Sequence, residues 1–201
     1  MQLTHVIELF PTPVLFSYYA QGITNSELTF IRELKMTRNV GNQRSVNTHV
    51  LDCPELAAIK SFCVETLQSY VDSVLQPKHE LIISLTQSWT NITRKGEMHH
   101  SHNHPNSLLS GVFYIETEQD SITFIQPERK LFAIPPAINN NHNAEKCSFK
   151  PATNEIIVFP SYLFHQVETK LNGGERISLA FNAIVKGALG SEDMLTELLL
   201  P

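Results

Sequence analysis

From Leu81 onward the apolar residues recur at every second position, and this period constrains the fold more than any other feature of the chain. The run Leu81–Ile92 alternates as a strand, and further β-rich runs with polar turns follow it. Many short strands in succession predict an antiparallel sandwich or jelly roll. We expect these further strands over residues 108–117, 122–126, 155–160, 164–169 and 176–185.

The region before Leu81 has a different period. Residues 6–19 predict an edge strand interrupted by prolines, and Asn25 or Ser26 is expected to cap a helix over 27–37. The polar stretch 38–49 indicates a loop. A longer helix is predicted over 54–75, with one apolar stripe that would pack it against a sheet. Helices followed by strands give an α+β fold.

Composition limits the class of protein. The 201 residues suit one domain spanning 1–201, with 42% hydrophobic and 17% charged residues. The net charge of −5 argues against general nucleic-acid binding. We expect no membrane span and no signal peptide, because no apolar run approaches ~20 residues and no basic segment leads into one. The expected location is therefore cytoplasmic. Three widely spaced cysteines indicate neither a disulfide framework nor a zinc ribbon.

Four histidines lie within six residues, in the segment His99-His100-Ser101-His102-Asn103-His104, and a separate histidine, His165, stands in a later strand. On a strand His100, His102 and His104 would share one face, with His99 on the other. Two of these three could hold one ion, with His165 as the third ligand. Such a site leaves open positions and suits non-haem iron better than structural zinc.

An arginine, Arg176, follows His165 about one hairpin later in the chain. The turn at 172–174 contains two glycines and predicts a hairpin, which would place Arg176 on the strand beside His165. Ser178 lies two residues further and shares the face of Arg176. A guanidinium with a neighbouring hydroxyl forms a good receptor for a small carboxylate.

Together these segments resemble the Fe(II)- and 2-oxoglutarate-dependent oxygenases, in particular a small bacterial and phage group of uncharacterised members. The motifs that carry the resemblance are Leu9-Phe10-Pro11-Thr12-Pro13, Trp89-Thr90-Asn91, His99-x-x-His102-x-His104-Pro105, Ser110-Gly111-Val112-Phe113-Tyr114, Phe159-Pro160-Ser161-x-x-x-His165 and Arg176-x-Ser178. The family implies a double-stranded β-helix (jelly-roll) core with the N-terminal helices packed on one sheet.

By this resemblance, three histidines bind Fe(II) and two further residues bind the C5 carboxylate of 2-oxoglutarate. The metal ligands are His102, His104 and His165, and the carboxylate receptor is Arg176 with Ser178. A looser match assigns polar contacts with the co-substrate to Tyr114 and Asn91, although Tyr114 could equally be a core aromatic.

The metal motif departs from the pattern of most of the superfamily. The position two residues after the first histidine is usually Asp or Glu, and here it is His104. Three histidines carry one negative charge fewer, which changes iron affinity and redox tuning. Alternatively, His100 and His102 form the pair and His104 supports it. We favour His102 and His104, because the resemblance aligns those two and leaves His99 facing away or in a supporting role.

The implied reaction consumes dioxygen and 2-oxoglutarate, releases succinate and CO2, and hydroxylates an unidentified primary substrate. Two alternatives stay open: a cupin-type three-histidine metalloenzyme that does not use 2-oxoglutarate, and a non-catalytic jelly-roll binding module. The oligomeric state is open as well, with a homodimer as one option. The long segment 127–150 is expected to be a loop, either a lid over the iron site or a surface excursion.

Overall fold

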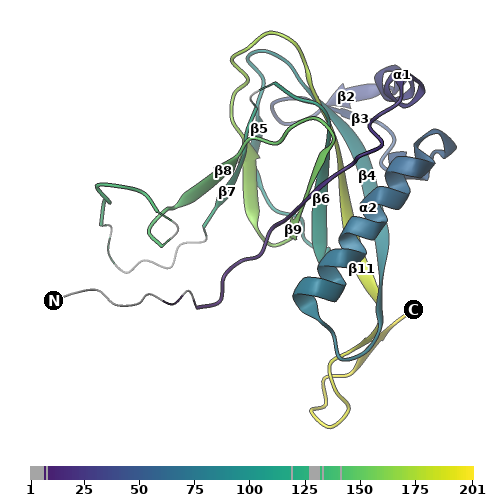
Figure 1. Cartoon of the computed structure of the whole chain (residues 1–201), viewed down its shortest axis with the longest axis vertical. Helices are drawn as coiled ribbons and strands as arrows, with labels where there is room; N and C mark the ends of the chain where they lie inside the picture. Colours follow the sequence, from purple (N-terminus) through teal and green to yellow (C-terminus); the bar gives the residue numbers. More distant parts are fainter. Residues whose placement is uncertain (1–6, 8, 119, 127–131, 133, 141) are drawn as a thin grey trace.

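In the computed structural model, two antiparallel sheets face each other as a jelly roll, and helices cover the outer face of the larger sheet (Figure 1). The structure describes residues 7, 9–118, 120–126, 132, 134–140 and 142–201. The larger sheet has the order β1-β9-β6-β11-β4-β3-β2, with β12 paired to β11. The smaller sheet has the order β5-β10-β7-β8. The predicted α+β jelly-roll class is confirmed.

The elements of the larger sheet are β1 Leu15–Tyr18, β2 Met36–Arg38, β3 Gln43–Ser45, β4 Leu81–Thr93, β6 Leu109–Glu116, β9 Glu155–Pro160, β11 Arg176–Leu189 and β12 Leu198–Leu200. The smaller sheet contains β5 His99–His102, β7 Ile122–Ile125, β8 Lys146–Phe149 and β10 Phe164–Val167. The helices are α1 Asn25–Glu33, the short 3-10 turns Val50–Asp52 and Pro54–Leu56, α2 Ala57–Tyr70, and a π-turn at Val71–Leu75.

The N-cap of the first helix lies one residue before the expected caps, Asn25 and Ser26. Thr24 is the N-cap: its side chain accepts from the backbone of Glu27, and the Glu27 carboxylate accepts from the backbone N–H of Thr24. This reciprocal capping box satisfies two backbone donors at the helix start. The helix ends at Glu33 rather than at residue 37, because the chain continues into β2.

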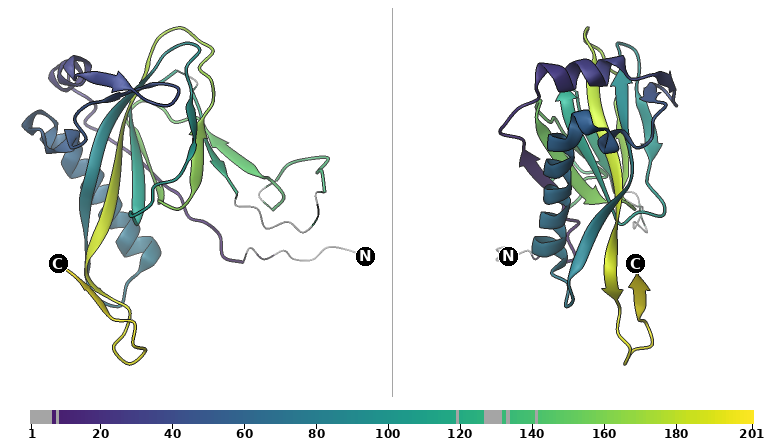
Figure 2. Two further views of the ribbon diagram at one scale, coloured as in Figure 1. Left: turned by 180° about the vertical axis from the view of Figure 1, so that it is seen from behind. Right: turned by 90° about the vertical axis from the view of Figure 1, so that its right-hand side faces the viewer.

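The second helix lies across the larger sheet, as the side view in Figure 2 shows. Its predicted stripe is largely confirmed, since Leu56, Ile59, Cys63 and Leu67 are fully buried. Val74, near the end of the predicted helix, is exposed, because it lies within the wider π-turn Val71–Leu75. Among the described residues, no helix is both long enough and apolar enough to span a membrane.

Alternate side chains of the central strands belong to two different hydrophobic cores, one on each face of the larger sheet. On β6, Phe113 and Ile115 face the helices, whereas Val112 and Tyr114 face the interior between the two sheets. On β11, Ile177, Leu179 and Phe181 likewise pack toward the helices. Period-two patterning therefore directs the even-numbered residues of β11, which include Arg176 and Ser178, into the space between the sheets.

Several predicted boundaries are corrected. The segment 38–49 contains the short strand β3, which forms a hairpin with β2. The first strand covers only 15–18, since Pro11 and Pro13 precede it. Part of 127–150 lies outside the described residues, and the end of that segment forms β8, paired with β7. A lid role for the remainder stays a prediction.

The expected hairpin between His165 and Arg176 is wrong. His165 lies on β10, which pairs with β5 and β7, whereas Arg176 begins β11, which pairs with β4 and β6. The glycine-containing turn carries the chain from the smaller sheet to the larger one. His165 and Arg176 therefore belong to opposite walls of the sandwich.

Candidate metal and co-substrate site

Three histidines converge on the inner face of the smaller sheet. His102 and His165 are paired directly across β5 and β10, with ring centroids 4.4 Å apart. His104 lies just past the end of β5, where its backbone N–H donates to the carbonyl of Ser161 at 2.9 Å. One ring nitrogen of each histidine lies within 4.8 Å of one from each of the other two. This spacing is compatible with three ligands on one face of an ion.

Hydrogen bonds to the backbone fix the orientation of two of these rings. The Nδ1 atom of His102 lies 2.8 Å from the carbonyl of His100, and Nδ1 of His165 lies 3.0 Å from the carbonyl of Leu163. Because a carbonyl only accepts, Nδ1 carries the proton in each ring. The Nε2 atom of each neutral ring then has a free lone pair, as a metal ligand requires.

Burial keeps the rings neutral. It lowers the pKa of His104 to about 4 and that of His165 to about 3, with the charge of His102 contributing to both shifts. Burial also lowers the pKa of His102. At neutral pH these imidazoles are therefore unprotonated and able to coordinate.

An irregularity in β5 changes the predicted position of His99. His165 and Val167 are two residues apart on β10. Their partners on β5, His102 and His99, are three residues apart. The extra residue is a bulge, which interrupts alternation and redirects side chains. His99 consequently lines the same cavity as His102, with ring centroids 4.4 Å apart. The expectation that His99 faces away is corrected.

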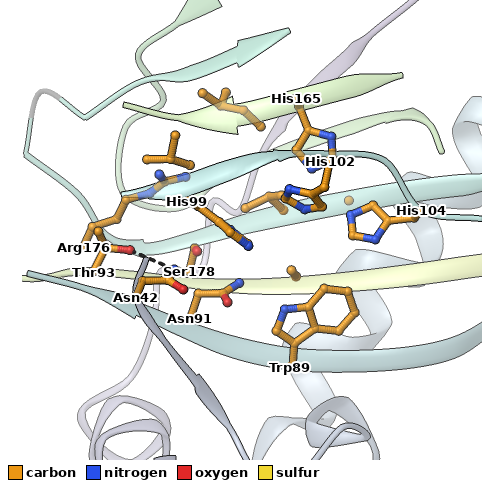
Figure 3. A pocket seen from close by; sticks show the side chains of 15 residues that line it. Asn42, Trp89, Asn91, Thr93, His99, His102, His104, His165, Arg176 and Ser178 are labelled. Carbon is orange, nitrogen blue, oxygen red and sulfur yellow. Dashed lines mark hydrogen bonds between the residues drawn. The ribbon is translucent and has the colours of Figure 1, made fainter. Parts of the chain in front are cut away.

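The opposite wall is built by three neighbouring strands of the larger sheet. Ser178 on β11 is paired with Asn91 on β4 and with Tyr114 on β6, so the three residues form one row. Arg176 is paired with Thr93 one step along. Figure 3 shows Asn91, Ser178 and Arg176 directed into the cavity that the histidines line from the other side.

Arg176 is buried beside an aromatic ring. Only 4% of its surface is exposed, and its Cζ lies 5.2 Å from the ring centroid of Tyr114, within cation–π range. Among the described residues Arg176 has no acidic partner, and its Nε has no hydrogen bond. Tyr114 is fully buried and its hydroxyl is also unpaired, with burial raising its pKa to about 12. A buried cation without an acidic partner indicates a place for an anion.

One residue of this wall was absent from the sequence prediction. Asn42 follows the sharp β2–β3 turn, donates from Nδ2 to Thr93 Oγ1 at 3.2 Å and is 5% exposed. Its Oδ1 has no partner, and Figure 3 shows the amide beside Asn91 and Ser178. The preceding Gly41 has a φ of +91°, which favours glycine, and a Cβ there would meet the Met98 carbonyl at 2.6 Å. The turn Asn39-Val40-Gly41-Asn42, with its glycine, was the sequence signal for this position.

The cavity between the walls encloses about 450 Å³, including its open mouth. Trp89 forms part of its floor, with its ring centroid 5.7 Å from that of His104. Asn91, His102, His104, His165, Arg176 and Ser178, all predicted from the sequence, line this cavity. Tyr114 lies beneath Arg176 and is not among the lining residues.

Comparisons with known proteins point to the Fe(II)- and 2-oxoglutarate-dependent oxygenases. Residues 87–182 match the sequence model of the family described as "Putative 2OG-Fe(II) oxygenase". The segment that contains most of these cavity residues therefore matches this family, and the predicted resemblance is confirmed. The family takes its name from the two cofactors that the sequence predicts, Fe(II) and 2-oxoglutarate. None of the curated proteins matches the chain.

Solved structures share the fold at low sequence identity. An oxidoreductase of the 2OG-Fe(II) oxygenase family from Burkholderia pseudomallei is 13% identical, with a TM-score of 0.58 over 85% of this chain and 83% of that one. HygX from Streptomyces hygroscopicus, solved with nickel, 2-oxoglutarate and hygromycin B, is 14% identical, with a TM-score of 0.57 over 86% and 82%. A Pseudomonas putida prolyl-4-hydroxylase is 10% identical, with a TM-score of 0.55 over 86% and 94%.

Proposed function

We propose that this protein is an Fe(II)- and 2-oxoglutarate-dependent dioxygenase that hydroxylates a C–H bond of a substrate still to be identified. His102, His104 and His165 hold the iron, and Arg176 with Ser178 holds the C5 carboxylate of 2-oxoglutarate. The observation that carries this proposal is the placement of three neutral imidazoles on one wall of a cavity and, on the opposite wall, a buried guanidinium whose Nε has no partner.

The side chains present fit both groups. Imidazole nitrogens are suitable ligands for Fe(II), and three of them on one side leave positions for a bidentate co-substrate and dioxygen. When bound, the iron couples oxidative decarboxylation of 2-oxoglutarate, which yields succinate and CO2, to oxidation of the substrate. The unpaired Nε of Arg176 supplies the charge and a donor that a dicarboxylate needs at its far end, and Tyr114 supports the guanidinium from beneath.

Asn42 completes the receptor if its amide is turned over. The oxygen and nitrogen of an asparagine amide are assigned from the surrounding hydrogen bonds. In the reversed orientation Oδ1 accepts from the Thr93 hydroxyl, and Nδ2 donates into the cavity beside Ser178. A carboxylate can only accept, so its binding selects this orientation. Residues 1–201 then act as one domain, because the N-terminal hairpin supplies part of the co-substrate site.

The protein contributes orientation and exclusion of water. The Nδ1–H bonds of His102 and His165 hold both rings in the tautomer that leaves Nε2 free. Arg176, held between the sheets, binds the distal carboxylate so that the keto acid end of the co-substrate points toward the histidines. Trp89 closes the floor near His104 and shields that side from solvent.

The deciding measurement is iron-dependent formation of succinate from 2-oxoglutarate by the purified protein without a histidine tag. We expect slow uncoupled turnover that requires Fe(II) and dioxygen. A substrate screen should then find a compound that accelerates turnover and gains one oxygen atom in its mass spectrum. Iron binding without any binding of 2-oxoglutarate would support the cupin-type alternative. Absence of stoichiometric metal binding would support the non-catalytic binding module.

A further inference from the structure

A second group of histidines lies beside the first and shares one member with it. Ring nitrogens of His99, His100 and His102 also lie within 4.8 Å of one another. The ring centroids of His100 and His102 are 4.9 Å apart with planes at 29°, and those of His99 and His100 are 5.3 Å apart. Among the described residues, no acidic side chain joins either group.

The contacts of this second group leave its nitrogens available. Nδ1 of His100 is buried and has no hydrogen-bond partner in the described part of the chain. Nε2 of His99 has only a long contact, 3.4 Å, with the side-chain Nδ2 of Asn39. Buried polar atoms without strong partners are uncommon and point to an absent ligand.

His102 can serve only one ion at a time. Its Nδ1 donates to the His100 carbonyl, so Nε2 is its single ligand atom. We propose that His99, His100 and His102 form a second transition-metal site, suited to Zn²⁺, Ni²⁺ or Cu²⁺, whose occupation excludes the ion bound by His102, His104 and His165. Neutral imidazoles select this class of metal over Mg²⁺ or Ca²⁺, which require oxygen ligands.

The β5 bulge explains how this site arises. Regular alternation would place His99 and His102 on opposite faces, whereas the extra residue brings both rings into one cavity. His99 lines that cavity between the first histidine group and the wall of Arg176 and Ser178 (Figure 3). An ion held there takes a ligand from the first site and occupies space on the path to the carboxylate receptor. Excess zinc is therefore inhibitory.

The test uses the full chain with the first site removed, so it does not depend on the proposed function. The variant His104→Ala/His165→Ala retains His99, His100 and His102. Calorimetric titration with Zn²⁺ should give one equivalent bound in the micromolar range. Adding His100→Ala in this background should weaken binding at least tenfold, whereas adding His79→Ala, an exposed histidine, should not change it. Equal zinc affinity with and without His100 would overturn the second site.

A second measurement keeps the wild-type site and tests the shared ligand. Because both sites need His102, the wild-type protein should bind one equivalent of Ni²⁺ rather than two. Two equivalents would overturn the exclusion. The His100→Ala variant should bind Ni²⁺ at the first site with unchanged affinity, and this metal should quench Trp89, the single tryptophan of the chain. His102→Ala should weaken nickel binding at both sites. A His102→Ala protein that binds nickel as tightly as the wild type would contradict the shared role.

Discussion

His102 and His165 face each other across adjacent antiparallel strands, and each donates its Nδ1 proton to a backbone carbonyl two residues before it. Two unrelated segments thus present their Nε2 atoms in the same way. Since backbone carbonyls accept the Nδ1–H bonds of both rings, the Nε2 lone pairs are positioned before any ion arrives. Preorganisation of this kind lowers the entropic cost of binding.

The metal assignment predicts the effect of removing one ligand. His165→Ala should abolish stoichiometric Fe(II) binding, because two histidines rarely hold iron against water, while the fold remains intact. The measurement is anaerobic titration followed by Trp89 fluorescence, with circular dichroism as the check on folding. His79→Ala is the matched control and should bind iron normally. If His165→Ala binds iron as tightly as the wild type, the ligand set is wrong.

The carboxylate receptor predicts a separation between co-substrate and metal affinity. Arg176→Ala should raise the dissociation constant of 2-oxoglutarate well over tenfold, because losing one partner of a buried charged pair costs ~2–5 kcal/mol. Metal affinity should barely change. Arg176→Lys should restore 2-oxoglutarate affinity only in part, since an ammonium cannot reproduce the paired N–H donors of the planar guanidinium. The exposed Arg38 provides a control, Arg38→Ala. Equal 2-oxoglutarate affinity in Arg176→Ala and the wild type would favour the cupin-type alternative.

Asn42 predicts a charge-dependent effect at the same receptor. Asn42→Ala removes one donor to a carboxylate and should weaken 2-oxoglutarate binding roughly 10- to 150-fold, in line with ~1.5–3 kcal/mol for a hydrogen bond to a charged group. Asn42→Asp should weaken it further, because two carboxylates would then face each other. Asn47→Asp adds the same charge on the exposed part of this segment and should have little effect. Tighter binding by Asn42→Asp would show that the occupant presents a donor instead.

The buried histidines predict acid sensitivity of the metal-free protein. The pKa of His165 is about 3 in the folded state, against 6.5 for an unperturbed histidine, with burial as the main cause. Below about pH 6.5, His165 therefore binds a proton in the unfolded chain but not in the folded protein. The free energy of unfolding consequently falls as pH decreases. Between pH 7 and pH 5, His165 alone should account for about 2 kcal/mol.

Chemical denaturation of the metal-free protein at several pH values measures this effect. His165→Gln should have a shallower dependence of the unfolding free energy on pH over this window, because glutamine does not titrate. His79→Gln, the same substitution at an exposed histidine, is the matched control. Identical slopes for His165→Gln and wild type would mean that His165 is protonated in the folded state.

The strands were predictable where alternation was long enough to define a face. The boundaries of β9 agree with the prediction residue for residue, and β6 agrees within one residue at each end. The short strands β2, β3 and β12 have three residues each, too few for a period to emerge. Thr24 was recoverable, since Thr-x-x-Glu is a recognised capping pattern.

The residues of the candidate site were more predictable than their arrangement. The types and spacing of His102, His104, His165 and Arg176 indicated their chemistry before any fold was known. Two features depend on tertiary structure and are invisible in the linear pattern: the bulge that turns His99 inward, and the crossover that sends Arg176 to the other sheet. A glycine-containing turn is compatible with either a hairpin or a crossover, so local sequence alone could not decide.

The separation of the histidines and the arginine onto different sheets has a consequence for selectivity. In the proposed function, the distance between the sheets would fix the length of the dicarboxylate that can reach both the histidines and Arg176. Phe159 and Leu163, which pack in the interior core beside His165, set this gap together with Tyr114. Since packed interiors resist compression, oxaloacetate, one carbon shorter than 2-oxoglutarate, would not reach both walls. 2-Oxoadipate, one carbon longer, would have to bend. Enlarging or shrinking a core side chain that touches neither ligand would retune which keto acid fits.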